Sequence, residues 1–177
     1  MFIKSCSRLV GLLLIAFISL QAQVHVEAYN PTTEELPFSQ MEVIEKVNEV
    51  RAKDGLAPLT LNSQLEAAAQ NKATDMAEQA YFSHIGPNNE RFWDFITEAD
   101  YRYYYAGENL AAHFSDVETL VNAWYNSPSH QANMLNAEYT ETGIGITYGT
   151  LHEKEGWFVV QMFANPTPDH ITLHTIN

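Results

Sequence analysis

Two apolar segments near the C-terminal end of this 177-residue chain constrain its fold more than any other feature. Residues 143–148 and 157–163 are rich in β-branched and aromatic side chains, which is typical of strands in the core of a sheet. The polar stretch between them, residues 149–156, predicts the loop of a hairpin. A further strand is predicted over residues 104–111. These segments together predict a small antiparallel sheet.

Helix-start signals lie ahead of these strands and between them. Three segments have the form of a capping box: Ser39-x-x-Glu42, Asn62-Ser63-x-x-Glu66 and Ser115-x-x-Glu118. After each start, apolar residues recur at helical spacing. The positions expected to face the core are Met41, Ile44, Val47 and Val50 in the first helix, Leu65, Ala69, Ala73, Met76 and Ala80 in the second, and Val117, Leu120, Val121 and Trp124 in the third.

The third helix is expected to end near Asn126, because Pro128 suits the first position of a new short helix that Ser127 can cap. Helices that flank a small antiparallel sheet give an α+β fold, an α-β-α sandwich. With 177 residues, of which 46% are hydrophobic, the chain is long enough for one well-buried core. We expect one domain over residues 39–166, after a Pro-, Thr- and Glu-bearing linker at 23–38 and before a tail at 167–177.

The N-terminal end has the pattern of a secretory signal peptide. Lys4 and Arg8 precede an apolar run over residues 9–20, and small residues follow. We expect residues 1–22 to be removed by cleavage after Ala22, with cleavage after Ala28 as the alternative. The apolar run is shorter than the ~20 residues that a membrane span requires. The sequence therefore predicts a secreted, extracellular protein without a stable membrane span.

Cysteine content and net charge limit how the mature protein is stabilised and what it binds. Cys6 is the only cysteine and would leave with the signal peptide, so the mature protein has no disulfide and must be held by its core. Loss of Lys4 and Arg8 takes the formal net charge from −13 to −15. Such an acidic chain is not expected to bind nucleic acid, and we interpret the charge as a solvated surface that keeps the protein soluble. We expect a monomer.

Three short motifs carry the residues that are able to do chemistry. They are Phe82-Ser83-His84, Gly107-Glu108-Asn109-Leu110-Ala111 and Ser127-Pro128-Ser129-His130-Gln131-Ala132-Asn133-Met134-Leu135. Together they bring two imidazoles and one carboxylate within reach of a single pocket. In this order, the motifs resemble the CAP superfamily, the secreted domain shared by cysteine-rich secretory proteins, venom allergens and pathogenesis-related proteins.

The resemblance runs from about Met41 to Pro166 and implies the same α-β-α sandwich. Without cysteines in its mature part, the chain looks most like the branch that is common in bacteria. The family has a pocket tetrad of two histidines and two glutamates, and some members bind zinc through the histidines. The resemblance implies that His84, Glu108 and His130 fill three of these positions. The fourth position, three residues after the tryptophan, holds Ser127 here.

Neutral imidazoles are good ligands for zinc, and a catalytic zinc usually has three protein ligands and a water molecule. His84, His130 and Glu108 are therefore the candidate metal ligands. If Glu108 is instead a general base, only the histidines would hold the ion and the affinity should be modest. The two histidines are equally well explained as hydrogen-bonded structural residues, and Glu108 as a residue bonded to backbone or paired with a cation. We interpret Asn109 as a backbone-bonding residue.

Two other arrangements are less favoured. Ser127 and His130 would share a helix face as in a serine hydrolase, but no Gly-x-Ser-x-Gly elbow is present and capping explains Ser127. An aromatic group (Phe92, Trp93, Phe95, Tyr101, Tyr103, Tyr104 and Tyr105) would be able to line a groove for an apolar ligand, although ordinary packing is the favoured interpretation. The histidines outside the motifs, namely His113, His152, His170 and His174, are expected to be solvated.

Three functions remain open. The missing carboxylate favours a non-enzymatic protein. The resemblance implies that such a protein binds a sterol, a fatty acid or an extracellular partner protein, here through a His/Glu cleft with an optional divalent metal. The alternative is a zinc-dependent hydrolase that uses Glu108 as its base. The third is a structural or interaction module whose cleft is vestigial.

Overall fold

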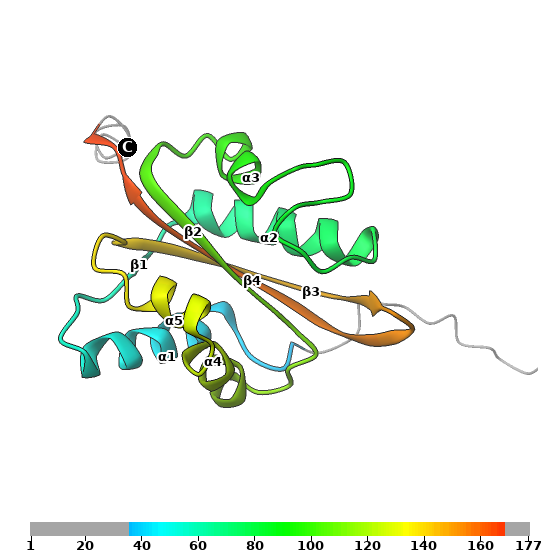
Figure 1. Ribbon diagram of the computed structural model, residues 1–177, viewed down its shortest axis with the longest axis horizontal. Helices are drawn as coiled ribbons and strands as arrows, with labels where there is room; N and C mark the ends of the chain where they lie inside the picture. The colour runs from blue at the N-terminus through cyan, green and yellow to red at the C-terminus, as the bar shows by residue number, and fades with distance from the viewer. Residues whose placement is uncertain (1–35, 169–177) are drawn as a thin grey trace, which may run out of the picture. The chain divides into compact units, whose positions relative to one another are not determined.

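The computed structural model describes residues 36–168 (Figure 1). The predicted signal peptide at 1–22, most of the predicted linker and residues 169–177 of the predicted tail lie outside this range. The elements follow the order α1 (Gln40–Lys53), β1 (Thr60–Leu61), α2 (Ser63–Glu78), α3 (Phe92–Glu98), β2 (Tyr103–Ala112), α4 (Val117–Tyr125), α5 (Pro128–Met134), β3 (Glu141–Leu151) and β4 (Lys154–Pro166). Among the described residues, no helix combines the length and the apolar character needed to cross a bilayer.

The sheet contains the three predicted strands in the order β3-β4-β2, and both of these pairings are antiparallel. One short strand was not predicted. β1 adds to the outer side of β3 in parallel, with Thr60 opposite Glu141 and Leu61 opposite Thr142, so the sheet is mixed. With two exposed residues, β1 has no hydrophobic alternation from which it could be recognised.

The predicted loop over residues 149–156 is wrong. β3 and β4 remain paired through this stretch, and the loop consists only of His152 and Glu153. Both residues have positive φ angles, 48° and 64°, as expected for a two-residue turn whose twist matches that of the flanking strands. The polar residues that suggested a long loop lie on the solvent-exposed end of the hairpin.

Helices cover both faces of the sheet, which confirms the α-β-α sandwich. α2 and α3 lie on one face, and α1, α4 and α5 lie on the other (Figure 1). Each face has its own apolar core. Leu65, Ala69 and Met76 of α2 pack against one face, and Val47, Leu120 and Trp124 pack on the other.

α2 lies unusually close to β3. A Cβ atom built on Gly143 would lie 2.1 Å from the backbone nitrogen of Glu66, and one built on Gly145 would lie 2.2 Å from the carbonyl carbon of Ala69. The two glycines on the strand therefore face the helix backbone itself, Gly143 at Leu65 and Gly145 at Ala69. This contact holds the first half of α2 directly against β3.

The helix starts agree with the sequence, apart from details. The Ser39 and Glu42 capping box is present, and the Asn62 side chain caps α2. α4 begins one residue later than predicted, because the carboxylate of Asp116 accepts a hydrogen bond (2.9 Å) from the backbone N–H of Thr119 in place of Ser115. Ser127 occupies the N-cap of α5, with Pro128 following it, but its side chain makes no capping hydrogen bond.

A few predicted core positions differ. Met41 is 45% exposed, and Ala80 lies beyond the end of α2. Phe38, assigned to the linker by sequence, is buried in the core next to α1. Arg51 is fully buried and ties α1 to the chain around α5, because its guanidinium donates hydrogen bonds to backbone carbonyls of Ala57, Met134, Asn136 and Tyr139.

Candidate functional site

The three motifs converge on β2. Successive side chains of a strand point to opposite faces of the sheet. Glu108 therefore points to the face that α2 covers, where it meets the segment that follows this helix. Asn109 points to the other face and meets α5. The two halves of the predicted site approach the same strand from opposite sides of the sheet.

On the first face, His84 and Glu108 form a close pair. Nδ1 of His84 lies 2.7 Å from Oε1 of Glu108. The His84 side chain is 56% exposed, whereas that of Glu108 is fully buried. The bond to Glu108 raises the pKa of His84, and burial raises the pKa of Glu108, an effect that the positive charges of His84 and Lys72 partly offset. At neutral pH, His84 is thus more often protonated than an ordinary histidine, which differs from the unprotonated state expected for a metal ligand.

A buried lysine lies behind this pair. Lys72 of α2 is fully buried, and its Nζ donates a 2.8 Å hydrogen bond to the hydroxyl of Tyr81, which in turn donates to the carboxylate of Asp75. The ammonium also lies over the rings of Tyr81 and Phe95. Burial lowers the pKa of Lys72, and the negative charge of Glu108 opposes that change.

Sequence reasoning missed Lys72. A signal was nevertheless present, because Lys72 lies three residues after Ala69 and four residues before Met76, on the apolar face of α2. A charged residue on such a face is rarely buried without partners. Oε2 of Glu108 is also buried, and no hydrogen-bond partner for it lies among residues 36–168.

On the second face, amide side chains hold α5 against β2. Nδ2 of Asn109 donates to the carbonyl of His130 at 3.1 Å. Nδ2 of Asn133 donates to the carbonyl of Glu108 (3.0 Å) and to Oδ1 of Asn109 (2.9 Å). The prediction that Asn109 bonds to backbone is confirmed. Burial lowers the pKa of His130, and the nearby charge of His84 lowers it further, so this imidazole is neutral at neutral pH.

The predicted zinc ligands do not fit a three-ligand centre. Within the described part of the chain, no group of three or more His, Cys, Asp or Glu side chains is arranged to hold a metal ion. Glu108 bonds to Nδ1 of His84, whereas His130 contacts β2 through its backbone carbonyl, which accepts from Asn109. Only the two imidazoles remain, fewer than the three protein ligands typical of catalytic zinc. Zinc binding stays a prediction.

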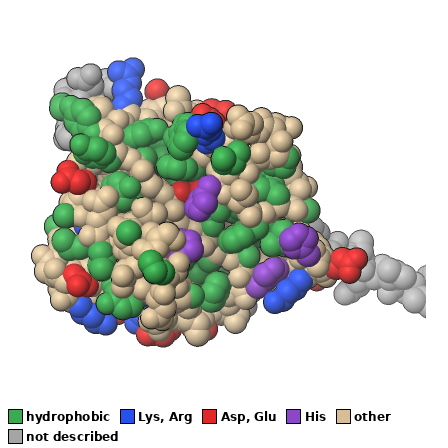
Figure 2. Space-filling model, viewed as in Figure 1, with side chains coloured by type: hydrophobic (Ala, Val, Ile, Leu, Met, Phe, Trp, Pro, Cys, Tyr) green, Lys and Arg blue, Asp and Glu red, His purple; other side chains and the backbone are tan. Residues whose placement is uncertain are grey.

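An apolar groove lies at the edge of the sheet, between β2 and the helices α4 and α5. It has a volume of about 420 Å³, and its lining comes from the outer end of β2 and the segment after it, from α4 and α5, and from single residues of two further segments: Leu110, Ala111, Ala112, His113, Phe114, Ala123, Trp124, Ser127, His130, Phe82 and Leu151. Figure 2 shows histidine side chains near the middle of this face of the molecule and others toward one edge, with hydrophobic side chains between them.

The groove does not use the aromatic group suggested by the sequence. Tyr101 is buried in the core, and Tyr104 and Tyr105 are exposed elsewhere on β2. The lining aromatics are instead Phe82, Phe114 and Trp124. His113 was expected to be solvated, but it is half-buried and lines the groove.

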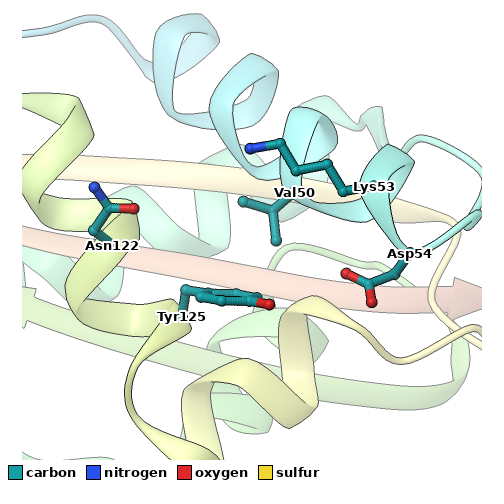
Figure 3. Close-up of a pocket in the computed structure, with 5 residues that line it drawn as sticks. All are labelled: Val50, Lys53, Asp54, Asn122 and Tyr125. Carbon is teal, nitrogen blue, oxygen red and sulfur yellow. The ribbon is translucent and has the colours of Figure 1, made fainter.

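A second hollow lies between α1 and α4, where the ring of Tyr125 lies close to Val50 with its hydroxyl on the side of Asp54 (Figure 3). Lys53 and Asn122 complete its lining. Its volume of about 150 Å³ is below the ~300 Å³ at which ligand pockets usually begin. The larger groove beside His130 is therefore the better candidate for a ligand site.

Comparison with curated proteins identifies two relatives in Bacillus subtilis (strain 168). YkwD is 36% identical over 118 residues, which cover 64% of this chain and 46% of YkwD. The membrane protein YlbC is 32% identical over 108 residues, which cover 61% of this chain and 31% of YlbC. The chain thus spans less than half the length of these curated relatives.

Solved structures from bacteria have a similar fold. An extracellular protein with an SCP domain from Bacillus anthracis str. Ames superposes with a TM-score of 0.63 at 28% identity, over 71% of this chain and 40% of that one. An outer surface protein from Borrelia burgdorferi gives a TM-score of 0.60 at 26% identity, over 71% of this chain and 90% of that one.

The family model described as CAP, cysteine-rich secretory protein family, matches residues 44–163. This match lies within the region in which the three motifs were recognised, and it includes His84, Glu108 and His130. Because the match covers more than half of its length, the chain belongs to the CAP family.

Proposed function

We propose that this CAP domain acts outside the cell and binds an apolar ligand in the groove between β2 and α4. The ligand is either a small lipid or an apolar segment of an extracellular partner protein. The observation that carries the proposal is the lining of the groove, in which Phe82, Leu110, Phe114, Trp124 and Leu151 surround a volume of about 420 Å³. Ligand pockets are typically of this size and mostly apolar, with a few polar groups at the rim.

The polar groups have a distinct place in this proposal. Ser127 and His130 line the groove beside its apolar residues. The imidazole of His130 is neutral and able to donate or accept a hydrogen bond, and His84, whose pKa is raised by its bond to Glu108, lies nearby. Such groups orient a ligand whose apolar part fills the groove.

An extracellular location is supported by two independent features. The N-terminal residues have the pattern of a signal peptide. The similar bacterial proteins are described as extracellular or outer surface proteins. In this setting the mature chain would fold without disulfides, through the two apolar cores on the faces of its sheet.

Burial of an acyl chain is sufficient to drive binding. Each methylene removed from water contributes about 0.8 kcal/mol. About eight buried methylenes therefore contribute about 6 kcal/mol before the cost of association is subtracted. For a ligand such as dodecanoate, we expect a dissociation constant of roughly millimolar size or weaker.

The proposal is tested by a substitution in α4 that places a large side chain in the groove. Ala123 is exposed and lines the groove, so Ala123→Phe should place a ring in it without disturbing the core. Ala67→Phe is the matched control, because Ala67 is an exposed alanine of α2 on the other face of the sheet. Binding of two probes is measured by calorimetry: dodecanoate and a capped apolar hexapeptide, Ac-Lys-Leu-Val-Leu-Thr-Lys-NH2.

We expect at least one probe to bind the wild type and the Ala67→Phe variant with equal affinity, and to bind Ala123→Phe at least tenfold more weakly. If neither probe binds, or if Ala123→Phe binds as tightly as the wild type, the groove is not the ligand site and the proposal fails.

A further inference from the structure

One wall of the groove is the edge of the sheet. β2 is the last strand in the order β1-β3-β4-β2, so its outer side has no neighbouring strand among the described residues. In an antiparallel ladder, the residues of an edge strand alternate between those whose backbone groups bond to the neighbour and those whose groups point outward. The register decides which backbone groups of β2 face the groove.

The alternation is fixed by several contacts. The backbone N–H of His113 donates to the carbonyl of Trp157 at 2.8 Å, so His113 is bonded toward β4. Because the pattern repeats every two residues, Ala111 (opposite Val159) and Asn109 (opposite Gln161) are also bonded toward β4. The two-residue turn between β3 and β4 gives the same alternation. In such a turn the backbone groups of Lys154, and of every second residue after it, bond to β3, so those of the residues between them bond to β2. Glu108, Leu110 and Ala112 therefore point their N–H and C=O groups outward.

Side chains already occupy two of these outward carbonyls. Asn133 donates to the carbonyl of Glu108 at 3.0 Å, and Nε1 of Trp124 donates to the carbonyl of Leu110 at 3.0 Å. Both contacts confirm the alternation, and both close the edge against another strand. The N–H and C=O of Ala112 differ, because no group within residues 36–168 bonds to either of them. Ala112 lines the groove.

We propose that the groove takes an extended apolar peptide segment, one residue of which pairs with the free N–H and C=O of Ala112 as an added β-strand. This inference rests on the proposed function of the groove and specifies its ligand class. Backbone polar groups need partners when they become buried, as these would be beneath an apolar ligand. A peptide supplies a donor and an acceptor at the spacing of a strand, whereas the carboxylate of a fatty acid only accepts.

The surroundings of Ala112 limit the pairing to a short stretch. On one side, the Trp124 side chain covers the Leu110 carbonyl. On the other, His113 has a φ of 65°, outside the extended region, so the strand ends there. A single peptide residue thus makes the two backbone bonds. Its apolar neighbours lie among Phe82, Phe114 and Trp124, which line the groove.

Charge restricts the peptide further. The chain has a formal net charge of −13, so an acidic peptide would be repelled. His84 lies close to the His130 end of the site, but its imidazole is paired with the carboxylate of Glu108. We therefore expect a neutral or basic apolar segment, and the hexapeptide with two lysines has this character.

The experiment removes the backbone donor alone. Ala112→Pro deletes the outward N–H, and because that N–H is not part of the ladder with β4, the sheet keeps its hydrogen bonds. Ala112→Ser is the control that keeps the N–H and nearly keeps the side-chain volume. Wild-type protein is also titrated with hexapeptides that carry one N-methyl group at successive positions, which deletes single donors from the peptide. Dodecanoate serves as the ligand without a backbone.

We expect Ala112→Pro to weaken hexapeptide binding about fivefold to tenfold, the size of one net hydrogen bond, and to have a smaller effect on dodecanoate, whose apolar chain needs no backbone donor. Ala112→Ser, which keeps the N–H, should weaken hexapeptide binding less than Ala112→Pro does, and one N-methyl position should weaken binding far more than its neighbours. If Ala112→Pro does not fold, the N-methyl series on the wild type decides the question.

The inference is overturned if the hexapeptide does not bind, if Ala112→Pro binds it normally, or if all N-methyl positions behave alike. In each of these cases the proposed function still stands, provided that dodecanoate binds the wild type and Ala123→Phe weakens that binding. If Ala123→Phe weakens neither probe, the groove itself is wrong.

Discussion

Replacing Gly145 by alanine tests how much the close contact between α2 and the sheet stabilises the fold. The new Cβ atom would lie 2.2 Å from the carbonyl carbon and oxygen of Ala69 and 2.4 Å from the backbone nitrogen of Gln70. Carbon atoms in contact are about 3.5–4.0 Å apart. α2 would have to move away from β3 by about 1.3 Å, because the obstructing atoms are helix backbone and no side chain is able to rotate away.

The cost of this movement exceeds that of an ordinary core insertion. Inserted methylenes typically cost about 1–3 kcal/mol, and here the shift also loosens the fully buried Leu65, Ala73 and Met76 of the same helix. We expect a loss of about 3 kcal/mol or more in the free energy of unfolding. With an m-value of about 1–3 kcal/mol per molar urea, the midpoint of unfolding should fall by about 1 M or more.

Gly55→Ala is the control for the glycine change itself. No atom lies within 4 Å of a Cβ built on Gly55, but its φ is +72°, so alanine there costs about 1–2 kcal/mol through backbone strain alone. Urea unfolding of both variants, followed by circular dichroism, gives the comparison. If Gly145→Ala loses no more stability than Gly55→Ala, the close packing of α2 on β3 does not constrain the fold as argued.

Four further outcomes are expected. Glu108→Gln should lower the pKa of His84, measured by NMR titration, because the bond to Glu108 is the main cause that raises it; an unchanged pKa would contradict this cause. Since that pKa is raised on folding, the stabilisation from protonated His84 should be present below about pH 6.5 and be lost as the pH rises through the folded-state pKa, in the wild type but not in Glu108→Gln. Arg51→Lys should cost at least about 2 kcal/mol in urea unfolding, because lysine does not reach the buried carbonyls that Arg51 bonds, and a neutral result would show that these bonds are dispensable. Calorimetric titration with zinc should give no tight one-to-one binding, and a tight isotherm lost in both His84→Ala and His130→Ala would restore the three-ligand prediction.

Local patterns were sufficient for the helices and long strands. Capping boxes and apolar periodicity are properties of short segments, so α1, α2 and α4 were predicted close to their observed starts. α3 was missed because its seven residues, rich in aromatic side chains, look like a cluster for packing. The long hairpin loop was wrong because polar residues occur equally in loops and in the solvent-exposed ends of paired strands.

The candidate site was predicted in part. Sequence motifs identified His84 and Glu108, which do form a pair, and the motif order identified the family. The alternation of a strand places Glu108 and Asn109 on opposite faces, so only Glu108 points toward His84. The groove was beyond sequence reasoning, because Phe82, Phe114 and Trp124 are far apart in the chain and meet only through the packing of α4 and the segment after α2.

The most direct test of the account is to map a bound ligand on the folded protein by NMR, from the changes in backbone amide shifts as the hexapeptide or dodecanoate is added. The account predicts that the largest changes lie on the outer end of β2, over residues 110–114, and on the end of α4 near Ala123 and Ser127. Changes centred on the hollow between α1 and α4, at Val50 and Tyr125, would contradict it, as would saturating binding that leaves residues 110–114 unaffected.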